Sequence, residues 1–241
     1  MQEIKFYPFS SDTAKFAPLP QPTSKVIPEW YKRQPASMND EEGIASQGIS
    51  NGTVKRCMPI FDMMTAGYIL SVPMDIHIDA SNPEQLKWST PVTVKKYAND
   101  MIATHHPDQV AHYPVDTDKY HKQLFRIMPF WSVKTPPGFS TMFMHPNHYD
   151  HLPFKTVPGF VDTDKFISDG HFSMHIEKGF VGIIKQGTPF AQVVPVKRED
   201  WTMKIIEQDA ADEEIREQRL KIRSIFRHGY KEKFRQKKDY K

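Results

Sequence analysis

The sequence predicts a mainly β protein with an extended, proline-rich N-terminal arm and a C-terminal helix followed by a basic tail. Residues 136–196 alternate short apolar runs with Gly, Pro, Asn and Asp, a pattern typical of compact antiparallel β structure. The chain contains 20 prolines and 11 glycines, and frequent proline shortens helices and favours strands, edges and ordered loops. We expect an N-terminal arm and loop over 1–52, a core domain over 53–206, and a C-terminal helix and tail over 207–241.

The composition is that of an ordinary globular protein. Of its 241 residues, 39% are hydrophobic and 25% are charged, and the formal net charge is +3. No apolar run approaches the roughly 18 residues that span a membrane, and the N-terminal segment lacks the pattern of a signal peptide. The single cysteine, Cys57, excludes an internal disulfide framework and a multi-cysteine zinc site. We therefore expect a location inside a cell, or in a particle assembled there.

The N-terminal arm is expected to be extended and anchored by aromatic residues. Ile4, Phe6 and Phe9 predict one edge strand. The prolines that follow interrupt any regular element. Trp30 and Tyr31 are large enough to tether such an arm by burying their rings against the protein's own core.

The core domain is expected to open with short β elements. These are a hairpin turn at Asn51-Gly52, a strand over Val54–Met58, a single helical turn over Pro59–Met64, and strands over 66–73 and 74–79. In the last strand Met74, Ile76 and Ile78 alternate with polar residues, which predicts one buried face. An excursion over 80–121 follows, with a short hairpin at Trp88 and Val92/Val94, and β structure resumes over 124–133.

The C-terminal region changes character. Residues 201–206 predict a last strand, and residues 209–226 predict a helix with acidic residues at its start and basic residues at its end. An apolar stripe on this helix, expected to pack on the body or on a neighbouring subunit, comprises Ile215, Ile222, Ile225 and Phe226. Residues 221–241 contain nine Lys and Arg and two acidic residues. This segment is either a solvated tail or a contact for nucleic acid or an acidic protein.

Two stretches of the core resemble a known superfamily. Residues 159–164 read Gly-Phe-Val-Asp-Thr-Asp, and residues 187–193 read Gly-Thr-Pro-Phe-Ala-Gln-Val. They resemble motifs of the dUTPase and dCTP-deaminase superfamily, whose fold is a distorted β-barrel called a β-clip. The resemblance implies that Asp162 positions or deprotonates the attacking water, that Asp164, Phe166 and Gln192 contact the nucleotide, that Mg²⁺ is the cofactor, and that the protein is a homo-oligomer, most often a trimer.

The sequence departs from that family where phosphate and metal are bound. Ile69 stands in place of an acid, and residues 145–148 read His-Pro-Asn-His in place of a Ser-Arg-Ser-Gly turn. The residues themselves favour a structural role for Asp162, which can cap the turn after Gly159 by accepting backbone N–H groups. The whole sequence is also similar to a family of tailed-phage proteins, through its Pro-Pro-Gly, Pro-Gly-x-Val-Asp-Thr-Asp and Gly-Thr-Pro-x-Ala-Gln patterns.

A histidine cluster predicts an alternative site. On a strand, the spacing of His148 and Asp150 places both side chains on one face. With His175, they match the two-His-one-carboxylate set of non-haem iron enzymes of the cupin or 2-oxoglutarate type. Surface histidines in a long turn are the simpler interpretation.

Three functions follow as hypotheses. The first is a phage-encoded, non-catalytic β-clip protein that acts as a virion or host-interaction component, located in the host cytoplasm or the virion. The second is a nucleotide-acting enzyme on the same scaffold. The third is an iron-dependent oxygenase. The sequence names no substrate, partner or host, and leaves open whether the protein is catalytic.

Overall fold

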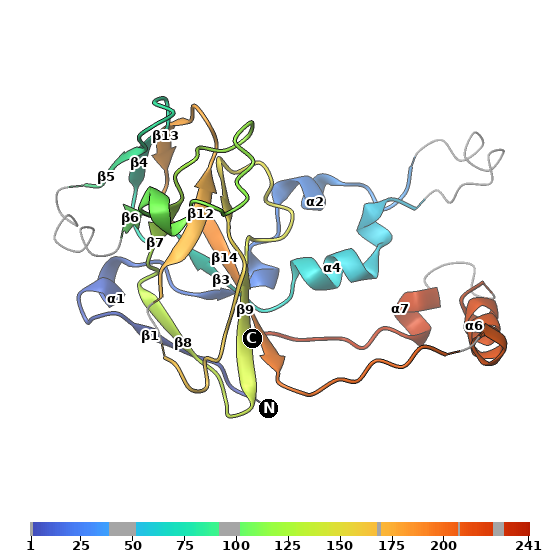
Figure 1. The fold of residues 1–241 in the computed structure, drawn as a ribbon. Coiled ribbons are helices and arrows are strands. Elements are labelled where there is room, and N and C mark those ends of the chain that lie inside the picture. The colour runs from blue at the N-terminus through green and yellow to red at the C-terminus, as the bar shows by residue number, and fades with distance from the viewer. Residues whose placement is uncertain (1, 39–51, 92–101, 168–169, 207, 224–228) are drawn as a thin grey trace. The chain divides into compact units, whose positions relative to one another are not determined.

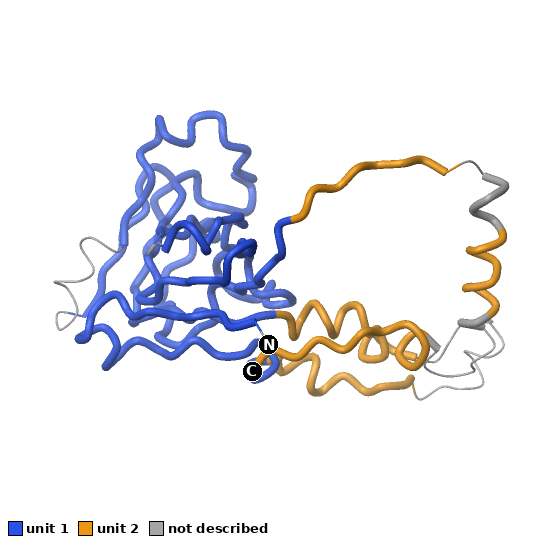
Figure 2. Tube along the Cα trace, turned by 90° about the horizontal axis from the view of Figure 1, so that it is seen from below, with its two compact units in different colours: residues 1–26, 67–198 blue, residues 27–66, 199–241 orange. Residues whose placement is uncertain are grey.

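The computed structural model describes residues 2–38, 52–91, 102–167, 170–206, 208–223 and 229–241 (Figure 1). The chain divides into two compact units (Figure 2). Unit 1 contains residues 1–26 and 67–198, and unit 2 contains residues 27–66 and 199–241. The domain boundaries expected from the sequence stay a prediction.

Unit 1 is built from short antiparallel strands, as the sequence predicts. The largest sheet has the order β11 (Gly159–Val161), β9 (Phe139–Met144), β14 (Pro189–Lys197), β3 (Tyr68–Ser71) and β2 (Gln21–Pro22). A second sheet has the order β10 (Phe154–Thr156), β12 (Phe172–Ile176), β7 (Phe125–Ile127) and β6 (Ile102–Thr104). The described strands form open sheets, and none of these sheets closes on itself as a barrel.

Two smaller sheets complete unit 1. One pairs β1 (Lys5–Pro8) with β8 (Trp131–Lys134), which confirms the edge strand expected around Phe6. The other has the order β13 (Val181–Ile184), β4 (Ile76–Asp79) and β5 (Lys87–Ser89). In β4, Ile76 and Ile78 are buried while His77 is exposed, so the predicted alternation is confirmed. The expected partner strand at Val92/Val94 lies outside the described residues.

The core of unit 1 lies between these sheets. Its largest fully buried side chains are Phe125, Phe130, Phe154, Phe190, Ile69, Leu70, Ile76, Ile78, Ile102 and Ile127. The N-terminal arm is held to this body: Phe6 and Phe16 pack against the core, and the Trp131 indole N–H donates to the Pro18 carbonyl at 2.8 Å. Short helical elements in the arm are α1 (Thr13–Phe16) and η1 (Thr23–Lys25), and η4 (Pro107–Gln109) lies in the expected excursion.

The regular elements named in the described parts of unit 2 are helices. It contains α2 (Glu29–Arg33), η2 (Val54–Arg56), α4 (Met58–Met64), α6 (Gln208–Arg223) and α7 (Gly229–Lys233). The predicted strand over 54–58 is wrong, because η2 occupies this stretch and Pro59 lies in the first turn of α4, where its missing N–H costs no hydrogen bond. The predicted helix over 209–226 corresponds to α6. Ile215 of its expected stripe is exposed, and the side chains of the other three stripe residues are outside the description.

Part of the basic tail is fixed within unit 2. Arg235 donates to both carboxylate oxygens of Asp62 in α4, at 2.6 to 3.1 Å, and both side chains are largely buried. This pairing holds the pKa of Asp62 below its ordinary value. The guanidinium also lies 5.8 Å from the centre of the Phe61 ring. Tyr31 is buried in the same unit, stacked on Phe61, whereas Trp30 remains partly exposed.

Candidate functional site

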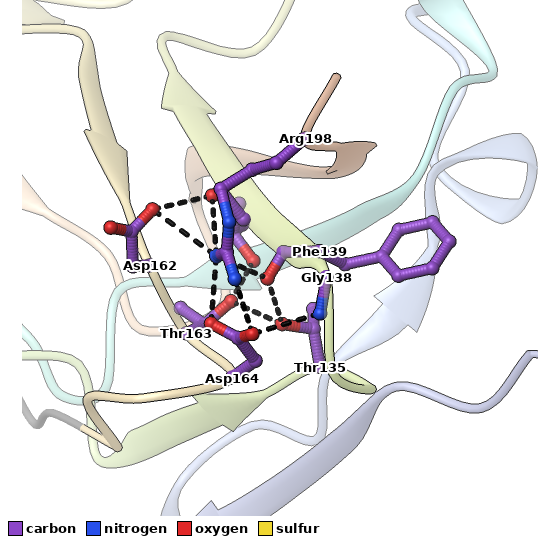
Figure 3. Close-up of polar contacts among 9 residues, drawn as sticks. Thr135, Gly138, Phe139, Asp162, Thr163, Asp164 and Arg198 are labelled. Atoms are coloured by element: carbon purple, nitrogen blue, oxygen red, sulfur yellow. Dashed lines mark hydrogen bonds and ion pairs between the residues drawn. The ribbon is translucent and has the colours of Figure 1, made fainter. Parts of the chain in front are cut away.

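The candidate site begins at the turn that follows β11. This strand pairs with β9, so that Val161 lies opposite Thr141. The chain then turns back, because the N–H groups of Lys165 and Phe166 both donate to the Asp162 carbonyl at 2.9 Å. The side chains of Asp162, Thr163 and Asp164 are thereby presented at one end of the largest sheet (Figure 3).

The Asp162 carboxylate binds side chains rather than backbone. Its Oδ1 accepts from the Ser140 hydroxyl at 2.6 Å and from Arg198 Nη1 at 3.3 Å. The side chain is 59% exposed. The expected cap through backbone N–H groups is made by the neighbouring acid instead, since Asp164 Oδ2 accepts from the Gly138 N–H at 2.9 Å.

Asp164 is enclosed. Its side chain is 2% exposed, and it forms a two-bond ion pair with Arg198, through Nη1 at 2.7 Å and through Nη2. The Arg198 guanidinium, followed by the Gly138 N–H, holds the pKa of the Asp164 carboxyl well below its usual range. The same pair raises the pKa of Arg198. Both groups are therefore charged at neutral pH.

Arg198 reaches the two acids because of the strand register. Lys197 pairs with Phe139 at the end of the β14–β9 ladder, and the Arg198 N–H continues it by donating to the Gly138 carbonyl at 2.8 Å. Its Nη1 also contacts the Ser140 hydroxyl at 3.1 Å and the Phe139 carbonyl at 3.3 Å (Figure 3). The sequence analysis missed this residue. The only signal available was a basic residue directly after a strand, with a pair of acids elsewhere in the chain.

Three buried threonines lie behind the ion pair. Thr163 Oγ1 is 2.7 Å from Thr135 Oγ1 and 2.7 Å from Thr141 Oγ1, and Thr135 Oγ1 donates to the Phe139 carbonyl at 2.9 Å. All three residues are at most 3% exposed. Buried hydroxyls satisfied in this way fix the turn to β9 and to the segment before it.

Phe166 borders a cavity of about 260 Å³. The cavity is mainly apolar, with Thr163, His171 and Ser173 as its polar side chains; the remaining lining residues include Trp131, Val133, Phe143, Val161 and Phe172. Phe166 itself is 61% exposed. Of the predicted nucleotide contacts, Asp164 and Phe166 therefore belong to one turn.

Gln192, the third predicted contact, is directed elsewhere. It is fully buried on β14, and its Oε1 accepts from the backbone N–H and the side-chain amide of Asn147, at 3.0 and 2.9 Å. Its role is to hold the turn that contains His145. His145 is engaged too: its Nδ1 accepts from the Thr156 N–H at 3.2 Å and its Nε2 lies 3.3 Å from the Tyr149 carbonyl.

The predicted metal ligands are not gathered into a cluster. His148 and Asp150 lie in a turn rather than on a strand, with His148 at φ 64°. His175 lies on β12, where its ring packs against Tyr113 and Tyr120 and its buried Nδ1 has no hydrogen-bond partner among the described residues. Within the described ranges, no group of three or more His, Cys, Asp and Glu residues is placed to hold a metal ion.

The acidic pair does not fit a magnesium ion either. Mg²⁺ is usually held by one or two carboxylates together with several waters, whereas Arg198 engages both oxygens of Asp164 and Oδ1 of Asp162, which leaves only Asp162 Oδ2 without a contact to this cation. Ile69, at the position where the resemblance expects an acid, is fully buried in the core.

No helix in the described residues is long and apolar enough to cross a membrane.

Comparisons with known proteins add one structural likeness. No family model matches the sequence, and no curated protein matches it. Among solved structures, the chain is similar to a mutant dUTPase from phage phi11 of S. aureus, for which the coordination of a structural Mg(II) ion is described. The identity is 8% and the TM-score is 0.37, over 86% of this chain and 98% of that chain. So low a score transfers no site and no activity.

Proposed function

We propose that this chain is a non-catalytic β-clip protein that acts by assembling with other copies and with a further partner, as a component of a virion or of a host interaction. The β-clip assignment is supported by the two sequence motifs, because residues 159–164 form β11 and the turn after it, and residues 187–193 include the first part of β14. The phage role is supported by the sequence resemblance to tailed-phage proteins.

The contact of Arg198 with both Asp162 and Asp164 carries the non-catalytic part of the proposal. A general base needs a free lone pair directed at water and a pKa near the working pH. Asp164 is enclosed and its pKa is far too low. Asp162 already accepts hydrogen bonds from Ser140 and Arg198 through one oxygen. Arg198 therefore engages both oxygens of Asp164 and one oxygen of Asp162, the residue that hydrolysis would use.

The remaining triphosphate contacts are also occupied or absent. Buried Ile69 offers no metal ligand, and the His145 turn directs its donors and acceptors to Thr156, Tyr149 and Gln192. Triphosphate binding requires several convergent cationic and backbone donors together with a metal-binding acid. The described residues near Asp162 supply two cations, Arg198, which is paired with the acids, and the exposed Lys165.

The test is a hydrolysis assay of the full chain and of Asp162→Asn with dUTP or dCTP and Mg²⁺. We expect no turnover from either protein and a lower melting temperature for the variant, since the amide weakens the contacts with Ser140 and Arg198. Turnover by the parent, lost in an equally stable variant, would overturn the proposal.

The cavity beside Phe166 favours one second candidate, a nucleotide-acting enzyme on the same scaffold. Its apolar lining and three polar side chains are the features of a small-molecule pocket. A thermal-shift titration with dUTP and dCTP, each with and without Mg²⁺, tests it. A saturable rise in melting temperature that Phe166→Ala abolishes would support this candidate. No observation favours the iron-dependent oxygenase.

A further inference from the structure

The segment after Arg198 exposes an unusual amount of apolar side chain. Trp201, Met203 and Ile205 are 85%, 89% and 82% exposed. Residues 201–206 form no strand and pair with no strand among the described residues, so the last strand expected there is not seen in the described part of the chain. From here on, the arm means residues 199–206 and not the N-terminal arm.

The arm has the pattern of a strand that is buried on one face. Three of its four apolar residues, Trp201, Met203 and Ile205, recur at every second position, and an extended backbone places them on one face. The fourth, Ile206, follows directly and is 51% exposed. A contiguous apolar surface of this kind marks an interaction site. A strand also needs an edge, because its backbone groups require partners.

β13 offers an edge with the matching pattern. It is the end strand of its sheet and pairs with β4, and no described strand lies on its other side. Val181 and Ile183 are 56% and 49% exposed. They are spaced two residues apart and therefore share one face of the sheet, as the apolar residues of the arm do. The alternative edge, β11, has a single exposed apolar residue, Phe160, in a strand of three residues.

The arm cannot reach β13 of its own chain. Pro189 of β14 pairs with Ser71, and Ile184 of β13 pairs with Ile76, so that the antiparallel register of β14 and β3 continues into β13 and β4. β13 thus lies beyond the start of β14, whereas the arm leaves from its end (Figure 1). The nine residues of β14 span about 26 Å. Trp201, three residues after Arg198, reaches at most about 10 Å from it, and Ile205, seven residues after it, at most about 25 Å, which is still short of β13 beyond the start of β14.

We propose that the arm of one copy adds as a strand to the free edge of β13 in a second copy, with Trp201, Met203 and Ile205 covering Val181 and Ile183. The inference rests on the proposed assembly function and specifies its contact. One buried tryptophan removes roughly 150–250 Å² from water. With Met203, Ile205 and the surface that they cover, the arm supplies a substantial part of the roughly 1,200–2,000 Å² of a stable interface.

The symmetry of the assembly follows from the fact that the two contacting segments, the arm and β13, are different parts of the chain. The arm follows the end of β14 in the chain, whereas β13 precedes its start, so the contact joins two different segments. Repeated contacts of this heterologous kind close into a ring when the rotation between copies closes. A three-membered ring is the assembly that agrees with the trimer expected from the sequence resemblance.

Disulfide capture tests the contact. In a Cys57→Ser background, one chain carries Ile183→Cys and a second carries Met203→Cys; the two are mixed, allowed to exchange subunits and mildly oxidised. We expect a covalent heterodimer in the mixture, far above the level in either variant alone. Leu19→Cys, at a 66% exposed position of unit 1, replaces Ile183→Cys as the matched control and should give background capture.

The outcomes separate the contact from the proposed assembly. An oligomer by light scattering without capture above the Leu19 control overturns the arm–β13 contact and leaves the proposed assembly standing. A single chain carrying both cysteines that forms only an internal disulfide also overturns the contact. A monomeric parent overturns both.

A second variant set keeps the proposal testable if the cysteines perturb the chain. Replacing Trp201, Met203 and Ile205 by Ser should reduce the solution mass to that of one chain, because these exposed side chains are not needed for folding. Changing Thr202 and Lys204 to Ser is the matched control and should preserve the assembly. An unchanged mass in the triple variant would contradict the proposal.

Discussion

Arg198 donates to both carboxylate oxygens of Asp164, with Nη1 at 2.7 Å from Oδ1 and Nη2 on Oδ2, although 34 residues separate them in the chain. This fork-shaped contact also extends to Asp162 and Ser140. It connects the end of β14, whose first part carries one sequence motif, to the turn after β11, which carries part of the other. Asp162, the catalytic residue by the sequence resemblance, and Asp164, a nucleotide contact by the same resemblance, thus share one ion-pair network.

The first prediction concerns Arg198. Arg198→Met should lower the melting temperature most, since it leaves the enclosed Asp164 carboxylate without its cation, and Arg198→Lys should recover only part of the loss because lysine lacks the planar fork. Lys165→Met, which removes an exposed cation from the same turn, is the control and should change little. If Arg198→Met and Arg198→Lys lower the melting temperature by the same amount, both below and above pH 7, the two-bond geometry of arginine does not contribute to stability.

The Asp164–Arg198 pair also predicts that the free energy of unfolding falls at acidic pH. The pKa of Asp164 is lower in the folded chain than its ordinary value of 3.8. The folded state therefore binds fewer protons, and stability that is present above this value is lost as the pH falls towards the lowered pKa. Denaturant titrations between pH 5 and 2.5 should show a steeper loss for the parent than for Arg198→Met.

Thr163 supports a second prediction, about buried hydroxyls. Thr163→Val retains the shape of the side chain but leaves Thr135 and Thr141 each without one 2.7 Å contact. Leaving buried polar groups unsatisfied costs about 1–3 kcal/mol, measured as the loss in the free energy of unfolding. Thr117→Val, at an exposed position, is the control. A loss no larger than that of the control would show that the hydroxyl chain is not stabilising.

Gly67 gives a third prediction. It adopts φ +71°, and a Cβ at this position would lie 2.0 Å from the Val193 carbonyl oxygen. Gly67→Ala should therefore cost about 2–4 kcal/mol, from left-handed strain and from overpacking. Gly138→Ala, at φ +82° with no atom within 4 Å of the added Cβ, separates the two causes and should cost only about 1–2 kcal/mol.

His145 gives a fourth prediction, in which stability depends on pH near neutrality. Burial lowers the pKa of His145 below its ordinary value of 6.5. In the neutral ring, Nδ1 accepts the hydrogen bond from the Thr156 N–H. Protonation would put a hydrogen on Nδ1 itself, so that two N–H groups would point at each other. The unfolded chain takes up this proton first, so stability is lost as the pH falls below 6.5. His145→Gln should make that slope shallower in urea titrations between pH 7.5 and 5.5, whereas exposed His77→Gln should not.

The sequence predicted elements whose signal is local. The alternation over Ile76–Asp79 identified β4 because burial repeats every second residue in a half-buried strand. The strand expected over Val54–Met58 failed because a run of this length has no distinct period, and Pro59 favours a helix start instead. The arm over 199–206 has a strand pattern without a partner strand among the described residues, which no local rule detects.

The candidate site was predictable only in part. Asp162, Asp164 and Phe166 share one turn, so a contiguous motif places them together. Arg198 and Ser140 join them through the β14–β9 register, and a single sequence does not specify which strands pair. Gln192 and His175 carry suitable groups, but their strands direct them to Asn147 and to the Tyr113 and Tyr120 rings.

The most direct test of the central claim, that the protein acts by self-assembly, is the absolute mass of the full chain by light scattering at micromolar concentration. One chain has a mass of 28.0 kDa. We expect an oligomer, with a mass three times that of one chain. A single species at the mass of one chain across the micromolar range would contradict it.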